Sequence, residues 1–262
     1  MSWSKKTFLV SFALFFLSFP SFFLNAQSIF GQANFSFTPE IYFVTRQREG
    51  GTKQSGMAYG IRSGYHRLEA GHFYYALDGL YSRGTLKGKN LVATLQSELT
   101  NSSLETRFGY TFYSCFLPKV TFTPFIGIGY LWEYYDYKAP SPIEVEFDNS
   151  FPYLPFGGLL CYHFNSSISI AAKLTARFLW DGKQTVKDPS YGKLTQCYEE
   201  RMQYRAELPI SYLYCWKNHL LSFSFTSFYE YRCYGSSVNF PYDFLQTELN
   251  FYGINFGLSC RF

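Results

Sequence analysis

The sequence predicts an all-β protein: a closed, antiparallel, up-and-down transmembrane β-barrel of about ten strands, with eight or twelve strands as alternatives. Three observations predict this fold. The 262 residues include 30 Phe and 24 Tyr and are 47% hydrophobic. The mean hydropathy is nevertheless only -0.12, so apolar and polar residues must alternate, as in strands with one face to lipid and one to a lumen. Beyond the first residues, no stretch approaches the roughly 18 apolar residues of a spanning helix.

Residues 1–26 are predicted to form a cleavable signal peptide, which leaves residues 27–262 as a single barrel domain. Lys5 and Lys6 precede an apolar run over residues 8–24, and the small residue Ala26 marks the expected cleavage site. The alternative is an N-terminal membrane helix, but Pro20 interrupts the run.

Period-two alternation identifies the strands in order along the chain. In the first, Phe37 and Ile41 share one face, and Ser36 and Glu40 share the other. The pattern recurs over residues 34–46, 56–65, 71–81, 103–112, 121–132, 153–164, 167–180, 202–214, 220–232 and 250–262. A secreted β-sandwich also alternates, but it does not require Phe or Tyr at nearly every outward position.

Residues 91–103 interrupt this pattern. Leu95 and Leu99 are odd-numbered, whereas the outward residues from Leu104 onward are even-numbered. We therefore expect a bulge or turn near residues 101–103 that resets the face. If residues 91–103 cross the membrane by themselves, the strand count becomes eight or twelve.

Short and long links alternate along the chain. Short links are expected near residues 67–70, 115–119, 165–166 and 215–219, and longer links near 47–54, 84–90, 135–150, 181–200 and 233–243. Barrels of the outer membrane have short periplasmic turns and longer outer loops. Residues 135–150 and 181–200 are the best candidates for contact with a surface ligand, because loops carry function on a rigid scaffold.

The last segment alternates and ends on an aromatic residue, with Ile254, Phe256, Leu258 and Phe262 on one face. In this respect the chain resembles small bacterial outer-membrane β-barrel proteins of the OmpA-type and opacity-type class. The resemblance implies export to the outer membrane, contact with outer-membrane lipid, and recognition of these four residues by the barrel-assembly machinery. It implies no particular activity, because one architecture serves many functions.

Charged residues on the polar faces are predicted to line the lumen. They are Glu40, Arg62, Asp78, Glu105, Arg107, Lys173, Arg177, Arg205, Glu207 and Glu230. A narrow barrel is filled by its own side chains, and buried charges are costly unless they are paired. We expect a salt-bridge plug, with a narrow polar pore or a gate as the alternative.

The sequence offers no catalytic, cofactor or metal site. His66, His72, His163 and His219 all map to the periplasmic ends of the predicted strands, away from the long loops. An enzyme would need a nucleophile or an activated water with a placed base, so a hydrolase is the least favoured function. The formal charge of +4 gives no indication of a nucleic-acid partner.

Six cysteines indicate an oxidising compartment and allow 15 pairings. Cys197 and Cys233 flank neighbouring predicted strands on the outer side, which suggests a disulfide between them. Asn101 and Asn165 each begin an Asn-Ser-Ser sequence, which we interpret as turn chemistry.

Together these features predict an outer-membrane barrel with a filled lumen that acts in surface interaction, adhesion or envelope integrity through its outer loops. A narrow channel for small polar solutes is the alternative.

Overall fold

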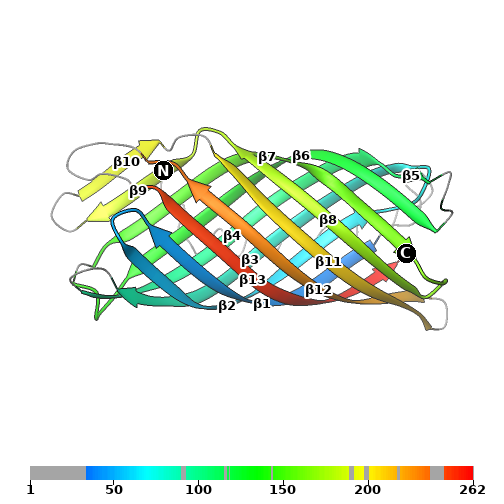
Figure 1. Ribbon diagram of the computed structural model, residues 1–262, viewed down its shortest axis with the longest axis horizontal. Helices are drawn as coiled ribbons and strands as arrows, with labels where there is room; N and C mark the ends of the chain where they lie inside the picture. The colour runs from blue at the N-terminus through cyan, green and yellow to red at the C-terminus, as the bar shows by residue number, and fades with distance from the viewer. Residues whose placement is uncertain are drawn as a thin grey trace.

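The computed structural model describes residues 34–89, 93–114, 117, 119–142, 144–188, 192–197, 201–216, 219–236 and 245–261. They form an elongated, closed barrel of antiparallel strands (Figure 1). No helix in the described part of the chain is long and apolar enough to cross a membrane. The expected signal peptide, residues 1–26, and Phe262 lie outside the described residues.

Ten strands make the wall, which confirms the predicted fold class and count. They are β1 (Asn34–Arg48), β2 (Thr52–Arg67), β3 (Phe73–Lys89), β4 (Thr94–Tyr110), β6 (Val120–Tyr137), β7 (Glu146–His163), β8 (Ile168–Leu179), β11 (Met202–Trp216), β12 (His219–Tyr234) and β13 (Thr247–Arg261). Strand β13 pairs with β1 along its length and closes the cylinder. Closure removes the free edges of this wall and excludes a β-sandwich.

Three further strands lie at the ends of the barrel. The two-residue strand β5 (Phe112–Tyr113) pairs with β6. Strands β9 (Lys183–Asp188) and β10 (Gly192–Cys197) form a hairpin within the predicted long link 181–200. Strand β9 pairs with the first residues of β7, so the hairpin extends the wall beyond the end of β8.

The two ends of the barrel differ in their links. We call the end where β1 starts and β13 finishes the terminal end, and the opposite end the loop end. At the terminal end, Asn165 Oδ1 accepts hydrogen bonds from the backbone N–H groups of Ser167 and Ile168 at 2.9 and 2.7 Å. Asn165 is therefore a turn residue, as predicted.

At the loop end the strands run further than the sequence suggested. Only residues 49–51 separate β1 from β2, and β3 continues to Lys89 through most of the expected link 84–90. Two of the expected long loops are therefore mainly wall, and the barrel is taller than the predicted strands require.

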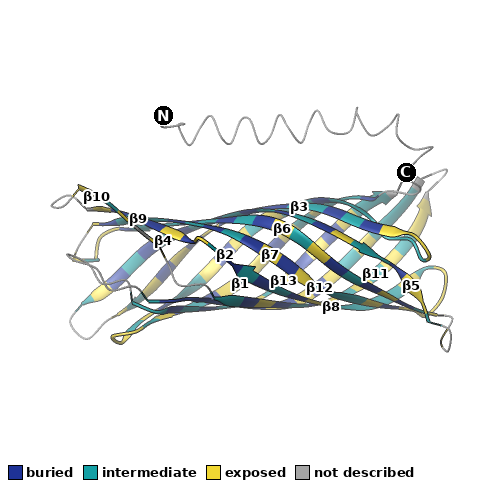
Figure 2. Cartoon of the chain, turned by 90° about the horizontal axis from the view of Figure 1, so that it is seen from above, coloured by how far each residue is buried: buried dark blue, intermediate teal, exposed yellow. Residues whose placement is uncertain are grey.

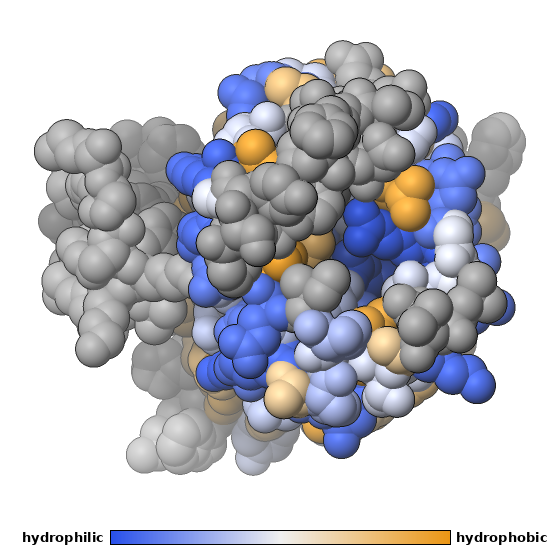
Figure 3. All heavy atoms as spheres, turned by 90° about the vertical axis from the view of Figure 1, so that its left-hand side faces the viewer, coloured by the Kyte–Doolittle hydropathy of each residue, from blue (hydrophilic) through white to orange (hydrophobic). Residues whose placement is uncertain are grey.

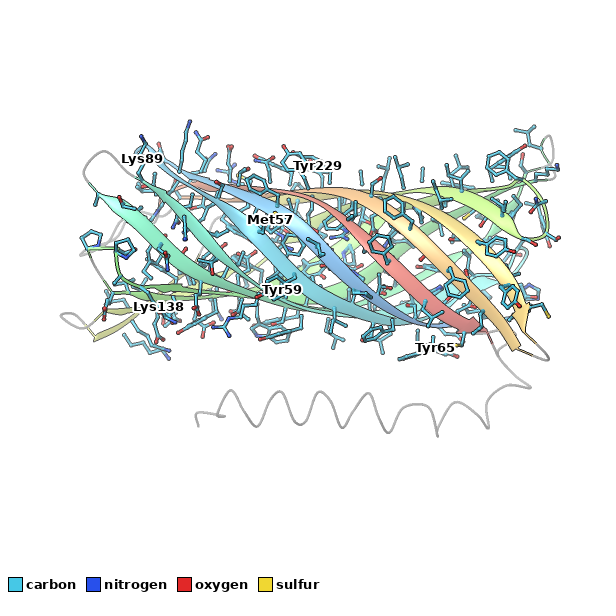
Figure 4. The ribbon with its side chains drawn as sticks, turned by 90° about the horizontal axis from the view of Figure 1, so that it is seen from below. Met57, Tyr59, Tyr65, Lys89, Lys138 and Tyr229 are labelled. Carbon is cyan, nitrogen blue, oxygen red and sulfur yellow. The ribbon has the colours of Figure 1, made fainter. Side chains whose placement is uncertain are left out.

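The outer surface carries an apolar belt around the barrel. Exposed apolar side chains on all ten wall strands form it: Phe37, Ile41, Met57, Ile61, Tyr81, Phe108, Ile126, Ile128, Phe156, Leu160, Leu174, Leu208, Ile210, Phe223, Phe225, Ile254, Phe256 and Leu258. Figure 4 shows Met57 and Tyr59 on this surface. A belt of this extent cannot face water, and it is the surface that hydrocarbon requires of a barrel.

Beyond the belt, toward the loop end, the outer surface becomes polar. Along β2 the outward residues pass from Ile61 and Met57 to Ser55 and Lys53. We call this part of the wall the protruding section; it includes residues 45–55, 82–89, 93–102, 130–142, 144–151, 231–236 and 245–251. Seen from the loop end, its rim is mostly hydrophilic (Figure 3).

The predicted bulge near residues 101–103 is absent. Strand β4 pairs with β3 without interruption from Thr94 to Tyr110, and its odd-numbered residues from Leu95 to Arg107 are all buried in the lumen. Asn101 is one of these buried residues, so its interpretation as a turn residue is wrong. Buried and exposed residues alternate in this way along the wall strands (Figure 2).

The apolar residues of β4 change from odd-numbered to even-numbered positions because the surroundings of the outer wall change from water to lipid. In the belt the outward residue Phe108 faces lipid, whereas Leu95 and Leu99 belong to the protruding section and point inward. A wall with water outside must keep its apolar residues inside. One uninterrupted strand therefore carries leucines on both of its faces.

Candidate functional site

The lumen holds one connected ion-pair network. Its members come from eight wall strands and comprise six carboxylates and six cations: Glu40, Arg62, Asp78, Glu105, Arg107, Glu133, Lys173, Arg177, Arg205, Glu207, Glu230 and Arg232. All ten lumen residues predicted from the sequence point inward, and all ten belong to this network. The equal number of charges of each sign fits the expected salt-bridge plug.

Glu230 is the centre of the network. Its carboxylate accepts hydrogen bonds from Arg177 Nη1 at 2.7 Å, Arg205 Nη1 at 2.6 Å and Arg232 Nε at 2.6 Å. These four residues are at most 5% exposed. Charge-assisted bonds of this kind are the strong ones, and each arginine depends on the carboxylate because a buried charge without a partner is very costly.

Arg205 connects Glu230 to the terminal side of the network. Its guanidinium lies 3.0 Å from Glu207 and 3.9 Å from Glu40. Lys173 Nζ then lies 2.7 Å from Glu207, and Arg62 Nε lies 3.5 Å from Glu40. Five strands far apart in the sequence thus meet through alternating charges.

Glu105 forms the other branch. Arg177 Nε donates to it at 3.2 Å and the Tyr153 hydroxyl at 2.9 Å, while Arg107 Nε lies 3.2 Å away as an ion pair without hydrogen-bond geometry. Arg107 also pairs with Asp78. Arg107 and Arg177 are therefore each shared between two carboxylates.

Sequence reasoning left out two members of the network, Glu133 and Arg232. Arg232 pairs with Glu133 and donates to Asn101 Oδ1 at 3.2 Å, and the Tyr234 hydroxyl donates to Glu133 at 2.6 Å. Arg232 is on the polar face of the segment 220–232, so alternation identifies it. Glu133 lies among Tyr and Trp residues, a composition typical of a membrane interface, although its odd number continues the inward parity of β6.

An apolar core overlaps the network and extends from it toward the loop end. It consists of Tyr42, Val44, Ala58, Leu86, Leu99, Leu131, Tyr135, Tyr137, Phe151, Tyr153, Leu179, Phe228, Tyr234, Leu249 and Phe251. The rings of Phe151 and Tyr234 stack with centroids 4.4 Å apart. Nine of these fifteen residues belong to the protruding section, and the other six extend the core to the level of the network, so the core occupies the place where a pore would have to pass.

A polar cluster covers the core near the loop end. Arg46 Nη1 donates to Gln54 Oε1 at 3.1 Å and bonds the Tyr137 hydroxyl, while Gln54 Nε2 donates to Ser97 Oγ at 3.1 Å. The guanidinium of Arg46 also lies over the ring of Tyr135, 4.3 Å from its centroid. Arg46 thus connects β1 with β2 and β6 and packs against Tyr135 of the apolar core.

On the terminal side of the network lies an open cavity of about 500 Å³. Hydroxyl and amide side chains line its wall: Asn34, Ser36, Thr38, Thr111, Thr121, Ser169, Ser211, Ser222, Ser224, Thr226, Asn255 and Ser259. Arg62, Asp78 and Lys173 form part of its floor, and they are the three predicted lumen residues that are not fully buried. We call this cavity the vestibule.

The order of these regions follows the strands. Along β1, Ser36 and Thr38 line the vestibule, Glu40 joins the network, and Tyr42 and Val44 enter the core. Toward the terminal end the lumen is hollow and mainly polar, with a small apolar cluster of Tyr74, Ala76 and Phe125. Toward the loop end it contains the ion pairs and the apolar core, which overlap along the axis.

The remaining predicted residues divide into two groups. His66, His72 and His163 lie at the terminal end as expected, and His219 is the first residue of β12 at that end. Ile254, Phe256 and Leu258 point outward on β13, which pairs with β1 as predicted.

The predicted disulfide is not present. The structure has Cys197 and Cys233 as free cysteines, as it does the other described cysteines. Cys197 ends β10, whose pairing with β9 attaches it to β7, so it does not come beside β12, which carries Cys233. The sequence placed both residues at the correct end but not their strands side by side.

The closed wall, the apolar belt and the charged lumen define the class: this is a transmembrane β-barrel with the fold of bacterial outer-membrane proteins. Among solved structures, the chain is similar to the outer membrane protease OmpT from Escherichia coli, with a TM-score of 0.59 at 10% identity over 89% of this chain and 98% of that one. At this identity the likeness concerns the fold alone.

Two further barrels align less closely. The translocator domain of the autotransporter NalP from Neisseria meningitidis gives a TM-score of 0.45 at 11% identity over 94% of this chain and 96% of that one. The outer membrane protein OprG from Pseudomonas aeruginosa gives 0.35 at 9% identity over 88% and 96%. No protein-family model matches the sequence, and no curated protein matches it.

Proposed function

We propose that this protein is exported through its N-terminal signal peptide and acts in surface interaction from the bacterial outer membrane, as a barrel that does not conduct. The observation that carries the proposal is the packed interior of the protruding section. The apolar core and the ion-pair network close the lumen, and a packed core makes the rim rigid. A rigid rim raised above the membrane is suited to binding a ligand outside the cell, and we infer no catalytic role.

Two features at the loop end are the proposed contact sites. The β9–β10 hairpin rises from the wall next to β7, and residues 138–142 and 144–145 are the described part of the link between β6 and β7. Lys187 of the hairpin pairs with Glu146 of β7 at 2.7 Å, which fixes the base of the hairpin. Loops on a rigid scaffold can bind a ligand without a large ordering cost.

A narrow channel is the second candidate, because the vestibule provides half of a polar pathway. Conduction would require the ion-pair network and the apolar core to move together. OmpT is an outer membrane protease, but fold-level likeness carries no activity.

Conductance separates the first two candidates. The folded protein is reconstituted in planar bilayers, and single-channel current is recorded over a range of voltages. Silence is expected, and reproducible unitary steps would favour the channel instead.

Surface interaction is tested in intact cells of a heterologous Gram-negative host. Wild-type protein should increase retention of the cells on a host-cell monolayer. Replacing residues 183–197 by a short Gly-Ser turn should abolish the increase, while heat-modifiable gel mobility verifies that the barrel still folds. Undiminished retention by the hairpin variant would contradict the assignment of the hairpin as a contact site.

A further inference from the structure

Three lysines gather on the outer wall of the protruding section. Lys53 on β2 and Lys89 on β3 are directly opposite in the strand register, and Lys87 is two residues from Lys89 on the same face. All three are exposed. Opposite residues have Cβ atoms about 5 Å apart and diagonal neighbours about 7–8 Å, so the three ammonium groups share one patch. Figure 4 shows Lys89 near the loop end, beyond Met57 and Tyr59 along the barrel axis.

Three other lysines of the loop end are paired with carboxylates, whereas Lys193 on β10, opposite Lys187 in the register, has no carboxylate within 4.0 Å among the described residues. Lys138 lies 3.1 Å from Glu98, Lys183 lies 3.1 Å from Asp181, and Lys187 pairs with Glu146. Within the described residues, no carboxylate lies within 4.0 Å of the ammonium groups of Lys53, Lys87 or Lys89.

The residues beside the three lysines carry no charge. In the register of the neighbouring strands, they are Gln47, Ser55, Thr94 and Gln96. Two carboxylates lie at the next positions on the same face: Glu98 is already held by Arg83 and Lys138, and Glu49 lies more than 4.0 Å from the ammonium group of Lys53. Like charges directly opposite each other destabilise a sheet. A bound anion would remove this repulsion, and the chain itself does not supply one in the described part.

The height of the lysine patch above the apolar belt restricts which kind of anion can bind to it. Met57 is the last apolar outward residue of β2, and Lys53 is four residues further toward the loop end. At about 3.3 Å per residue and a strand tilt of about 40°, the lysine stands about 10 Å beyond the belt. The headgroup layer of an ordinary phospholipid leaflet is only about 5–8 Å deep. The patch therefore lies above the phosphates of an ordinary phospholipid, at a height that phosphate groups carried on an extended saccharide headgroup can reach.

We propose that Lys53, Lys87 and Lys89 bind the phosphate groups of a phosphorylated glycolipid in the leaflet at the loop side. Lysine binds phosphate as a point charge, and three convergent ammonium groups match a headgroup with more than one phosphate. The bound glycolipid would contact the outer wall of the protruding section at β2 and β3.

The test uses the folded barrel in nanodiscs of phosphatidylcholine that contain a labelled lipopolysaccharide. Wild-type protein is compared with the triple variant Lys53→Gln, Lys87→Gln, Lys89→Gln. The control is the triple variant Lys138→Gln, Lys183→Gln, Lys187→Gln, which removes the same charge from ion-paired lysines of the same end. All six side chains are exposed, and heat-modifiable mobility verifies folding of each variant.

The first triple variant is expected to bind the lipopolysaccharide at least tenfold more weakly, and the control variant within about twofold of wild type. Replacing the three patch lysines by Arg should retain binding, because the charge is kept. Equal losses in the two Gln triples would overturn the proposal, since only net charge would then matter.

Three further arms identify the source of the anion. Chemically dephosphorylated lipopolysaccharide should lose the difference between wild type and the patch variant. Phosphatidylglycerol should not reproduce that difference, and inorganic phosphate at millimolar concentration should not compete. A patch-dependent effect with phosphatidylglycerol, or full competition by inorganic phosphate, would rule out the glycolipid headgroup.

Discussion

The belt section and the protruding section of this barrel are built from the same strands, yet their apolar side chains point in opposite directions. In the belt, Phe108 of β4 faces outward and Glu105 lies in the lumen. In the protruding section, Leu99 of the same strand lies in the lumen and Glu98 faces outward. The side-chain period of a strand is unchanged by its surroundings. The solvent on the outer side therefore decides which face is apolar.

The lumen reflects the same difference. Beside the belt, the interior is mainly polar, because most apolar residues of each strand are used on the lipid side, and its charges must pair with one another. A small cluster of Tyr74, Ala76 and Phe125 is the apolar part of that interior. In the protruding section, water covers the outer wall and the interior can form an ordinary apolar core. The vestibule thus lies toward the terminal end, and the ion-pair network and the core overlap toward the loop end.

The largest expected effect concerns the centre of the ion-pair network. Glu230→Gln removes the carboxylate shared by Arg177, Arg205 and Arg232, and should lower the free energy of unfolding by about 3–5 kcal/mol, because buried cations lose their partner. Urea unfolding in lipid vesicles measures it. Glu146→Gln, in the exposed pair with Lys187, should cost less than about 1 kcal/mol. Equal losses would mean that the network does not stabilise the barrel.

A leucine pair compares the two sections directly. Leu99→Ala leaves a cavity in the core of the protruding section and should cost about 3 kcal/mol. Leu174→Ala acts in the belt, where the side chain is 64% exposed in the barrel and lipid can fill the space, so its cost should be well below that of Leu99→Ala. Urea unfolding in lipid vesicles compares the two losses of unfolding free energy. A larger loss for Leu174→Ala would refute the conclusion that apolar side chains face outward in the belt and inward in the protruding section.

A lysine introduced on the outer wall should destabilise the belt more than the protruding section, the reverse of the order expected for the leucine pair. Ile61→Lys places an ammonium group in the belt and should cost about 2–3 kcal/mol, as for cations on the lipid face of barrels. Thr85→Lys is on the outer face of β3 in the protruding section and should be nearly neutral, because water solvates it there. If both substitutions are neutral, the belt does not contact hydrocarbon.

The smallest expected effect is a pH dependence in the protruding section. The hydrogen bond from Arg83, and then that from Lys138, lowers the pKa of Glu98. A lowered pKa in the folded state means that this pair stabilises the barrel above the ordinary pKa of glutamate and loses its effect as the pH falls through the folded value. Between pH 7 and pH 3, Glu98→Gln should therefore show a shallower decrease of the urea midpoint than wild type. Parallel decreases would show that the pair makes no contribution.

Much of this arrangement was predictable from alternation. The ten strands, the inward direction of the ten charged residues and the outward direction of Ile254, Phe256 and Leu258 all follow from period two. Alternation failed at Leu95 and Leu99, because we assumed one solvent along the whole strand and therefore inferred a bulge. It also passed over Glu133, since its aromatic neighbours indicated a membrane interface.

Alternation could not predict which charges pair. Glu105 contacts Arg177, and Glu230 contacts three arginines from three strands. These distances depend on strand tilt and on how the register staggers around the cylinder. The predicted pairing of Cys197 with Cys233 failed for the same reason, because sequence order does not show that β9 inserts beside β7.

The sequence by itself determined that strands with one apolar face would form a barrel wall and that their charges would be enclosed, because the side-chain period is local and needs no knowledge of the fold. Only the tertiary structure decided how far the wall rises beyond the belt, which charges meet, and where three unpaired lysines converge. Those features depend on closure of the cylinder, which brings distant strands together and sets the height of each residue relative to the membrane.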